Sequence, residues 1–372
     1  MQPIALTFAP SRPATPPALP HPAPEVLRAH GGSRNNGRYA TAIGNGEWHT
    51  VWTAPAVGDA FPHAVLAHGF GAFVNADSAW LHYDRAHLSD RRRRATGDAE
   101  WDTTRNLVYT TDHDSQFIAV PIPSFGHGFH AALVGGSNST RSFLHRVKDT
   151  FVVASIADKI GGGKMTTLET IEVNHEGSRR RGLLIETESG ALLVAVHNEI
   201  IVAAYSNRVD FLDLNLQYLR RLSGVFEPRG LSIDEAGRVV MRVDGTLWQF
   251  TVRGECVATA LPDGSPYLDS PPLIGYDHRA YVLGARRILE VSETGAPEWM
   301  YETADKITGA AITGDDRLLA SIGSKLMRFT SDGRAATLRE FPGETLLTAP
   351  AFNERGELLV MSNHALHCLW RG

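Results

Sequence analysis

Charged residues in the short polar loops that precede apolar strands could bind an anionic or zwitterionic ligand. Carboxylates and cations occur together in these loops, and an arginine guanidinium can hold a carboxylate or phosphate through two parallel hydrogen bonds. Solvated polar loops without a ligand are the alternative interpretation. The candidate binding residues are Asp98, Trp101, Arg141, Arg181, Arg229, Asp269 and Lys306.

A second candidate is the predicted hairpin turn at 111–115, which places Asp112 and Asp114 on either side of His113. Two carboxylates and an imidazole could ligate a metal, or the histidine could act as an acid or base that an aspartate orients. The spacing matches no calcium loop, and aspartate is common in turns for local reasons. We therefore predict no metal site and keep these three residues as the candidates for one.

No established catalytic motif is present in the sequence. It contains no Gly-x-Ser-x-Gly elbow, no His-Glu-x-x-His and no complete dinucleotide fingerprint, so neither a nucleophile nor a cofactor is predicted. If the protein is an enzyme, the polar residues that could take part are His63, Glu100, His113 and Arg229.

The composition favours a folded protein and disfavours several partners. The 372 residues are 43% hydrophobic and 21% charged, and a net charge of -5 provides no bulk attraction to nucleic acid or anionic lipid. No apolar run approaches the roughly 18 residues of a membrane span, and the N-terminus has no basic signal-like region. We expect a cytoplasmic protein. Cys256 and Cys368 are expected to be buried thiols rather than a disulfide.

One pattern recurs every 36 to 46 residues or so from Trp48 onward, a period typical of propellers and solenoids. Each unit has a short strand, a tight turn, a β-branched strand, another turn and a third strand, as at 151–153, 192–194 and 318–320. No helical period of similar strength appears, which excludes alternating β/α folds. The pattern predicts an all-β protein: a single β-propeller of about eight four-stranded blades, with seven as the alternative. The candidate binding loops would then surround one mouth of the central channel.

The two ends of the sequence are expected to meet in one blade. The C-terminal run 366–370 reads as a third strand with nothing after it, whereas 46–54 matches the internal fourth strand at 295–304. Strand 47–54 should therefore complete the last blade and cover two open strand edges. Residues 1–36 are rich in proline and alanine and are predicted to be an N-terminal arm, with 37–372 forming the propeller.

This rhythm resembles the pyrroloquinoline-quinone-like repeats of quinoprotein-type propellers. The resemblance is carried by SRNNGRYATAIGNGEWHTVWTAPA at 33–56, by 295–304 and by DDRLLASIGSKLMRFTSDG at 315–333. The family includes quinone-dependent dehydrogenases, a lipoprotein scaffold for outer-membrane assembly, and many propellers that bind no quinone. The dehydrogenases carry adjacent cysteines and a calcium site, whereas Cys256 and Cys368 are far apart in sequence. The resemblance therefore implies the fold and not the cofactor.

A well-specified scaffold without a catalytic signature indicates a binding protein. We expect a non-catalytic binding or assembly propeller of a bacterial multiprotein system, which engages a protein partner through its rim and channel face. Binding of a small molecule in the channel is a further alternative. The alternative is an enzyme, a lyase, cyclase or hydrolase that acts on a small or peptidic substrate at the channel mouth.

Overall fold

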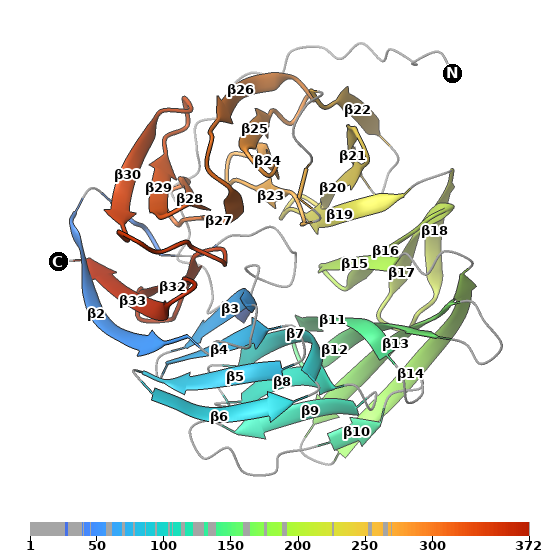
Figure 1. The fold of residues 1–372 in the computed structure, drawn as a ribbon. Coiled ribbons are helices and arrows are strands. Elements are labelled where there is room, and N and C mark those ends of the chain that lie inside the picture. Colours follow the sequence, from blue (N-terminus) through green and yellow to red (C-terminus); the bar gives the residue numbers. More distant parts are fainter. Residues whose placement is uncertain are drawn as a thin grey trace.

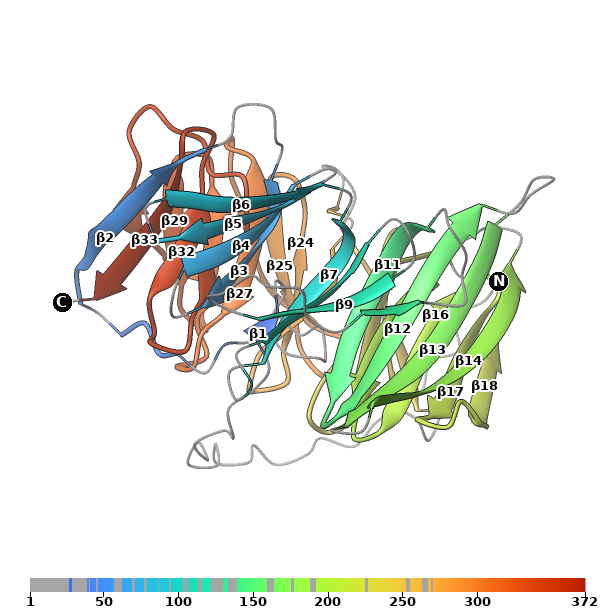
Figure 2. The same cartoon turned by 90° about the horizontal axis from the view of Figure 1, so that it is seen from below.

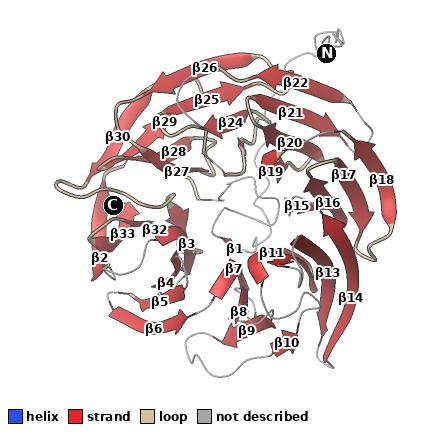
Figure 3. Cartoon of the chain, turned by 45° about the vertical axis from the view of Figure 1, so that its right-hand side comes forward, coloured by secondary structure: helices blue, strands red, loops and turns tan. Residues whose placement is uncertain are grey.

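The structure of the chain is a computed structural model in which every described element is a β-strand (Figures 1 and 3). The described residues are 27–28, 39, 41–44, 46–56, 62–68, 71–76, 79–85, 87–93, 95–102, 105, 107–112, 116–121, 130–132, 139–158, 164–174, 177–187, 192–224, 227–251, 255–262, 267–268 and 270–371. Within them, no helix is long and apolar enough to cross a membrane.

Most strands belong to four-stranded antiparallel sheets built from consecutive segments. Five such sheets run in chain order from the inner to the outer strand. They are β3 (Pro62–His68), β4 (Gly71–Ala76), β5 (Ala79–Asp84) and β6 (His87–Arg93); β15 (Leu192–His197), β16 (Ile200–Tyr205), β17 (Arg208–Asp213) and β18 (Tyr218–Ser223); β19 (Pro228–Ile233), β20 (Arg238–Val243), β21 (Thr246–Thr251) and β22 (Cys256–Ala260); β23 (Leu273–Ile274), β24 (Ala280–Leu283), β25 (Arg287–Val291) and β26 (Pro297–Glu302); and β27 (Ile307–Ile312), β28 (Leu318–Ile322), β29 (Lys325–Phe329) and β30 (Ala335–Glu340).

Two further sets of four strands are joined in one nine-stranded sheet. The link is a parallel contact between β7 and β11, at Gly97 and Ser142, and the short strand β1 (Leu27–Arg28) also pairs with β7. The two sets are β7 (Ala95–Asp102), β8 (Leu107–Asp112), β9 (Gln116–Pro121) and β10 (His130–Ala132), and β11 (Ser139–Val147), β12 (Thr150–Asp158), β13 (Lys164–Asn174) and β14 (Gly177–Thr187).

The remaining sheet contains the pairing predicted between the two ends of the sequence. Strand β2 (Trp48–Pro55) lies outside β33 (Ala365–Arg371), which is followed inward by β32 (Leu358–Met361) and β31 (Ala351–Phe352). The register runs from Trp48 opposite Arg371 to Pro55 opposite Ala365. The N-terminal strand therefore takes the fourth position that the C-terminal strands leave open. Apart from Leu27–Arg28, the predicted arm at 1–36 lies outside the described residues.

Apolar strands and short turns explain why each sheet forms. In β15 and β16 nearly every side chain is buried, which suits strands with a neighbouring sheet on both faces. Between them, Asn198 and Glu199 both have positive φ angles, as a two-residue type I′ hairpin turn requires. One hydrophobic cluster contains Leu319, Leu359 and Val74, so it joins three successive sheets. Packing between sheets therefore provides the core.

The sheets are arranged around a common centre in Figure 1, with β3, β15, β19 and β27 nearest to it. Strands β6, β18, β26 and β30 lie at the rim, and the rim strands have open edges. One-residue register shifts occur in β2, β6, β18, β26 and β30 against the neighbouring third strand. Such bulges twist a strand and disfavour edge-to-edge pairing with another chain.

An N-terminal segment, described at Tyr39 and 41–44, contacts the turn that joins β27 to β28. Backbone hydrogen bonds connect Tyr39 to Ile312 and Gly314 to Thr41, at 2.8 and 2.7 Å. The Asp315 carboxylate accepts from the N–H groups of Ile43 and Gly44, at 2.9 and 3.1 Å. Tyr39 and Ile43 are both buried, against the cluster that contains Phe352. The segment is thus part of the folded body.

Candidate functional site

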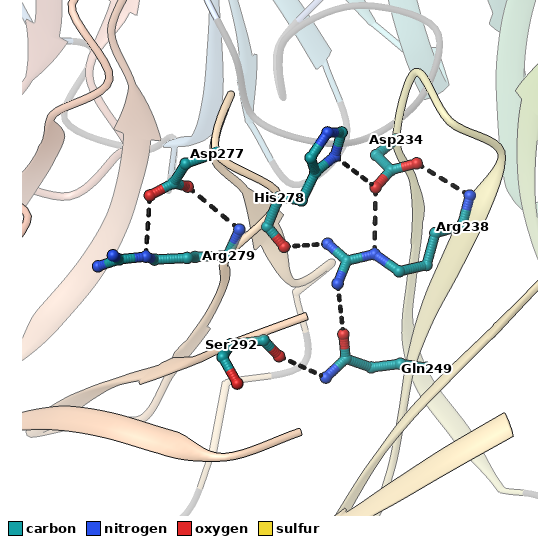
Figure 4. A network of polar contacts seen from close by, with 7 residues as sticks. All are labelled: Asp234, Arg238, Gln249, Asp277, His278, Arg279 and Ser292. Atoms are coloured by element: carbon teal, nitrogen blue, oxygen red, sulfur yellow. Dashed lines mark hydrogen bonds and ion pairs between the residues drawn. The ribbon is translucent and has the colours of Figure 1, made fainter. Parts of the chain in front are cut away.

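A network of polar contacts is centred on Asp234, directly after β19 (Figure 4). Its Oδ1 accepts the backbone N–H of Arg238 at 2.9 Å, a local bond that closes the turn into β20. Its Oδ2 accepts from the Arg238 Nε at 3.1 Å and lies 3.1 Å from His278 Nδ1. Asp234 is fully buried, so its charge is matched by two neighbours rather than by water.

The Arg238 guanidinium carries the network from one sheet to the next. Its Nη1 donates to the Gln249 Oε1 at 2.7 Å, and its Nη2 donates to the carbonyl oxygen of His278. The Gln249 amide then donates to the carbonyl of Ser292 at 3.0 Å. His278 and Ser292 belong to turns of the sheet β23–β26, so these bonds fasten that sheet to β19–β22.

The next sheet repeats the arrangement with different residues. Arg279 begins the segment that leads into β24, contacts Asp277 at 2.9 Å and donates to Glu290 at 2.7 Å and to the carbonyl of Ser331 at 3.1 Å. The partner on the third strand lies eleven residues after the arginine in both cases, at Gln249 and Glu290. The network is therefore a repeated device that links neighbouring sheets.

The surroundings of Asp234 keep its carboxylate ionised beside Arg238 and His278, which does not suit proton transfer. Burial alone raises the pKa of this carboxyl, but hydrogen bonds from His278 and Arg238 and the charge of Arg238 outweigh burial and lower the pKa to about 2. A carboxylate this acidic is a poor general base near neutral pH. For Glu290, burial raises the pKa and the bond from Arg279 opposes it only in part.

A second cluster joins Glu344, Ser362 and His367. The Glu344 Oε2 lies 2.8 Å from His367 Nε2, and it also accepts from the Ser362 hydroxyl. The Ser362 Oγ lies 3.4 Å from the same Nε2 and accepts from the N–H of Ala365 at 2.9 Å. A proton relay needs the serine and the carboxylate on opposite nitrogens of the imidazole. Here both contact Nε2, so the cluster pins the loop before β31 to the β32–β33 turn.

These two clusters lie on different faces. In consecutive antiparallel strands the connections alternate between two ends, so first-to-second turns share one face and the loops that precede first strands share the other. The Asp234 network lies in first-to-second turns, whereas the predicted binding residues were assigned to the opposite face. The sequence interpretation therefore favoured the face that lacks this network.

Most predicted site residues lie within strands. The described backbone places His63 in β3, Asp98, Glu100 and Trp101 in β7, Asp112 in β8, Arg141 in β11, Arg181 in β14, Arg229 in β19, and Lys306 just before β27. Asp98 and Arg141 lie beside the contact that pairs β7 with β11. His113, Asp114 and Asp269 lie outside the described residues.

The sequence prediction differs from the structure at Asp98, Glu100, Trp101 and Arg181. Glu100 lies between the candidate loop residues Asp98 and Trp101 in sequence, but its side chain is fully buried in β7. Asp98 and Trp101 belong to the same strand rather than to a loop. Arg181 lies in β14, the strand farthest from β11 in its set, and so at the rim rather than at the channel mouth. Position in the loop was inferred from polarity, and polar residues also occur inside these strands.

Arg229 and Lys306 are exposed. Arg229 is 3.8 Å from Glu227 and 3.7 Å from Asp244, two long contacts between exposed side chains that contribute little stability. No group of three or more metal-ligating side chains occurs among the residues that the structure describes. Cys256 and Cys368 are both free, and Cys368 is buried; burial raises the pKa of its thiol to about 12.

The sequence did not indicate the Asp234 network. The signal that could have found it is the recurrence of an arginine and a polar residue eleven positions later, at 238 and 249 and again at 279 and 290. The contact between Asp234 and His278 spans 44 residues and has no local signature.

No family model and no curated protein matches this sequence. Solved structures match over most of the chain. BamB from Moraxella catarrhalis matches at 14% identity and a TM-score of 0.61, covering 87% of this chain and 98% of BamB. A streptogramin B lyase matches at 11% identity and a TM-score of 0.51, covering 75% of this chain and 93% of the lyase. Raptor from Chaetomium thermophilum matches at 10% identity and a TM-score of 0.53, covering 75% of this chain and 28% of Raptor. These likenesses and the four-stranded antiparallel sheets show that the chain is an all-β protein with a β-propeller fold.

Proposed function

We propose that this protein is a non-catalytic binding or assembly propeller that engages a protein partner through its rim, with the channel face as a second contact. The observation that carries the proposal is where apolar side chains are exposed. In the described part of the chain, the large hydrophobic residues with open surface lie on rim strands or next to them. They are Val51, Leu88, Tyr218, Leu219, Met300 and Trp370.

Exposed apolar side chains are typical of interfaces where they adjoin one another, as Tyr218 and Leu219 do in β18. The rim strands are exposed to solvent, as the burial pattern of β30 shows, so these side chains lie on a solvated surface. Their solvation cost is removed when a partner covers them. The bulges in the same strands favour contact through side chains over addition of another strand.

The enzyme alternative has weaker support. Streptogramin B lyase shares the fold, so a lyase, cyclase or hydrolase is compatible with it. Glu100, one of the candidate catalytic residues, is fully buried and cannot contact a substrate. The carboxylates of Asp234 and Glu344 are engaged in links between strands and sheets. An activity that alanine at His63, His113 or Arg229 abolishes would favour the enzyme.

The experiment is cross-linking of the tagged full-length chain in its native cells. A rim variant carries serine at Val51, Leu88 and Met300; a control variant carries serine at Thr53, His87 and Glu298, exposed polar residues on the same three strands. We expect a protein partner with the wild type and the control, and its loss with the rim variant, at equal melting temperatures. Free monomer from the wild type, or equal recovery from both variants, would overturn the proposal.

A further inference from the structure

The outer edge of the sheet β15–β18 holds two arginines around one buried carboxylate. Asp210 is fully buried in β17, and its Oδ2 accepts from the Arg208 Nε at 2.9 Å. Its Oδ1 accepts from the Arg221 Nε at 2.6 Å, and the Arg221 Nη2 lies 3.3 Å from Oδ2. The carboxylate therefore fixes the orientation of both guanidinium groups.

Each guanidinium also lies over an aromatic ring. The Arg208 Cζ is 4.4 Å from the ring centre of Tyr205, and the Arg221 Cζ is 4.8 Å from that of Tyr218. The Arg221 side chain is 47% exposed, so its planar group is held in place and still open to solvent. A preorganised guanidinium loses little conformational entropy when it binds a carboxylate.

The exposed charge on this edge is positive. Residues 208–223 contain three arginines and two aspartates. Asp210 is buried, and Asp213 accepts the N–H groups of Asn215 and Gln217 in the β17–β18 turn. Strand β14, which carries three consecutive arginines in its sequence, lies beside β18 along the rim in Figures 1 and 2. In a chain of net charge -5, this is a local reversal of sign.

Apolar surface adjoins the arginines. Tyr218 and Leu219 are 50% and 53% exposed, and Leu219 is the extra residue in the register shift of β18. Tyrosine and arginine are among the residue types that contribute most at interfaces. The bulge disfavours strand addition, so a partner would contact these side chains and not the strand edge.

We propose that this edge, formed by Tyr218, Leu219, Arg220 and Arg221, binds an acidic segment of a protein partner that also carries apolar side chains. The inference rests on the proposed function, because it names which part of the rim is used and which chemistry it recognises. Carboxylates of the segment would meet the arginines, and its apolar side chains would cover Leu219.

The test uses the full-length chain and two fluorescent peptides. One alternates glutamate with leucine, and the other has glutamine in place of glutamate. Fluorescence anisotropy should show tighter binding of the glutamate peptide, weakening as salt rises, because the screening length falls from about 10 Å at 0.1 M to about 3 Å at 1 M. Arg220→Ser should weaken binding by about tenfold, a change of about 1.4 kcal/mol.

Matched variants separate the surface from overall charge. Arg339→Ser removes the same charge from β30, an exposed rim position elsewhere, and should leave binding unchanged. Leu219→Ser should weaken the binding of both peptides, whereas Arg221→Lys should weaken that of the glutamate peptide only, because the ammonium keeps the charge but loses the planar fork. Equal melting temperatures would show that the variants are folded.

Three results would overturn the inference: equal affinity for the two peptides, equal effects of Arg220→Ser and Arg339→Ser, or tighter binding of a single-stranded oligonucleotide than of the glutamate peptide. The proposed function can fail separately. If the variant at Val51, Leu88 and Met300 loses its partner in cells while β18 variants keep it and bind peptide normally, rim binding stands and the β18 assignment is wrong.

Discussion

The imidazole ring of His68 stacks on that of His82, with centroids 5.3 Å apart and planes 8° from parallel. Both side chains are buried in the sheet β3–β6. Burial, and then the charge of His82, lowers the pKa of His68 to about 3. The folded protein therefore holds His68 neutral over a pH range in which the unfolded chain, with a pKa of 6.5, takes up a proton.

This difference predicts a pH dependence of stability. As pH falls from 6.5 towards 3, the unfolded state binds a proton that the folded state excludes, so the free energy of unfolding falls by up to about 1.4 kcal/mol per pH unit. His68→Gln should reduce the loss of unfolding free energy with falling pH, measured by urea unfolding between pH 7 and 4. His87→Gln, at an exposed position, should leave this pH dependence unchanged. Parallel curves for wild type and His68→Gln would contradict the prediction.

Alanine substitutions at two glycines, Gly333 and Gly343, should distinguish the cost of backbone strain from the cost of a packing clash. Gly333 and Gly343 both have a φ of +79°, but a Cβ on Gly333 would lie 2.8 Å from ring atoms of Trp299, whereas one on Gly343 meets nothing within 4 Å. Trp299 is stacked on Phe329, which limits its movement. Gly343→Ala should cost about 1 kcal/mol from strain, and Gly333→Ala about 1 to 3 kcal/mol more from the clash.

Chemical denaturation of the two glycine variants is the measurement. Because the φ angles are equal, the difference between the variants reports the contact between neighbouring sheets. If Gly333→Ala is no less stable than Gly343→Ala, Trp299 does not pack as the structure shows.

N-terminal truncations should show which part of the segment before β3 contributes to stability. Removal of residues 1–36 leaves Tyr39, Ile43 and β2 in place and should give a folded protein. Removal of 1–46 takes away the two buried side chains and the partners of Asp315, and should lower the melting temperature. Removal of 1–55 also exposes the edge of β33 and should cause aggregation. Light scattering and thermal unfolding measure these effects; a soluble, equally stable 1–55 truncation would refute the assigned role of β2.

Asp234→Asn should test the link between the sheets β19–β22 and β23–β26. The ionised carboxylate contributes to stability above its unfolded pKa of 3.8, and this contribution is lost as pH falls through about 2. At pH 6 the variant should be less stable by about 2 kcal/mol, and the deficit should shrink between pH 4 and 2. Glu293→Gln, an exposed change of the same kind, is the control. A deficit that stays constant with pH would argue against an ionised Asp234.

Local sequence determined the strands and turns of this protein. Apolar runs such as 192–194 follow from residue types that are neighbours in the chain. The one long-range feature that the sequence predicted, pairing of β2 with β33, was found because segment 46–54 resembles an internal fourth strand.

Tertiary structure alone decided which polar residues meet. Glu100 is a polar residue, yet its position in β7 places its side chain in the buried interior. Asp234 meets His278 from the next sheet, and Ser362 meets Glu344 across a loop. The physical reason is that strand propensity depends on neighbours in sequence, whereas the partners of a buried charge depend on how whole sheets pack around the centre.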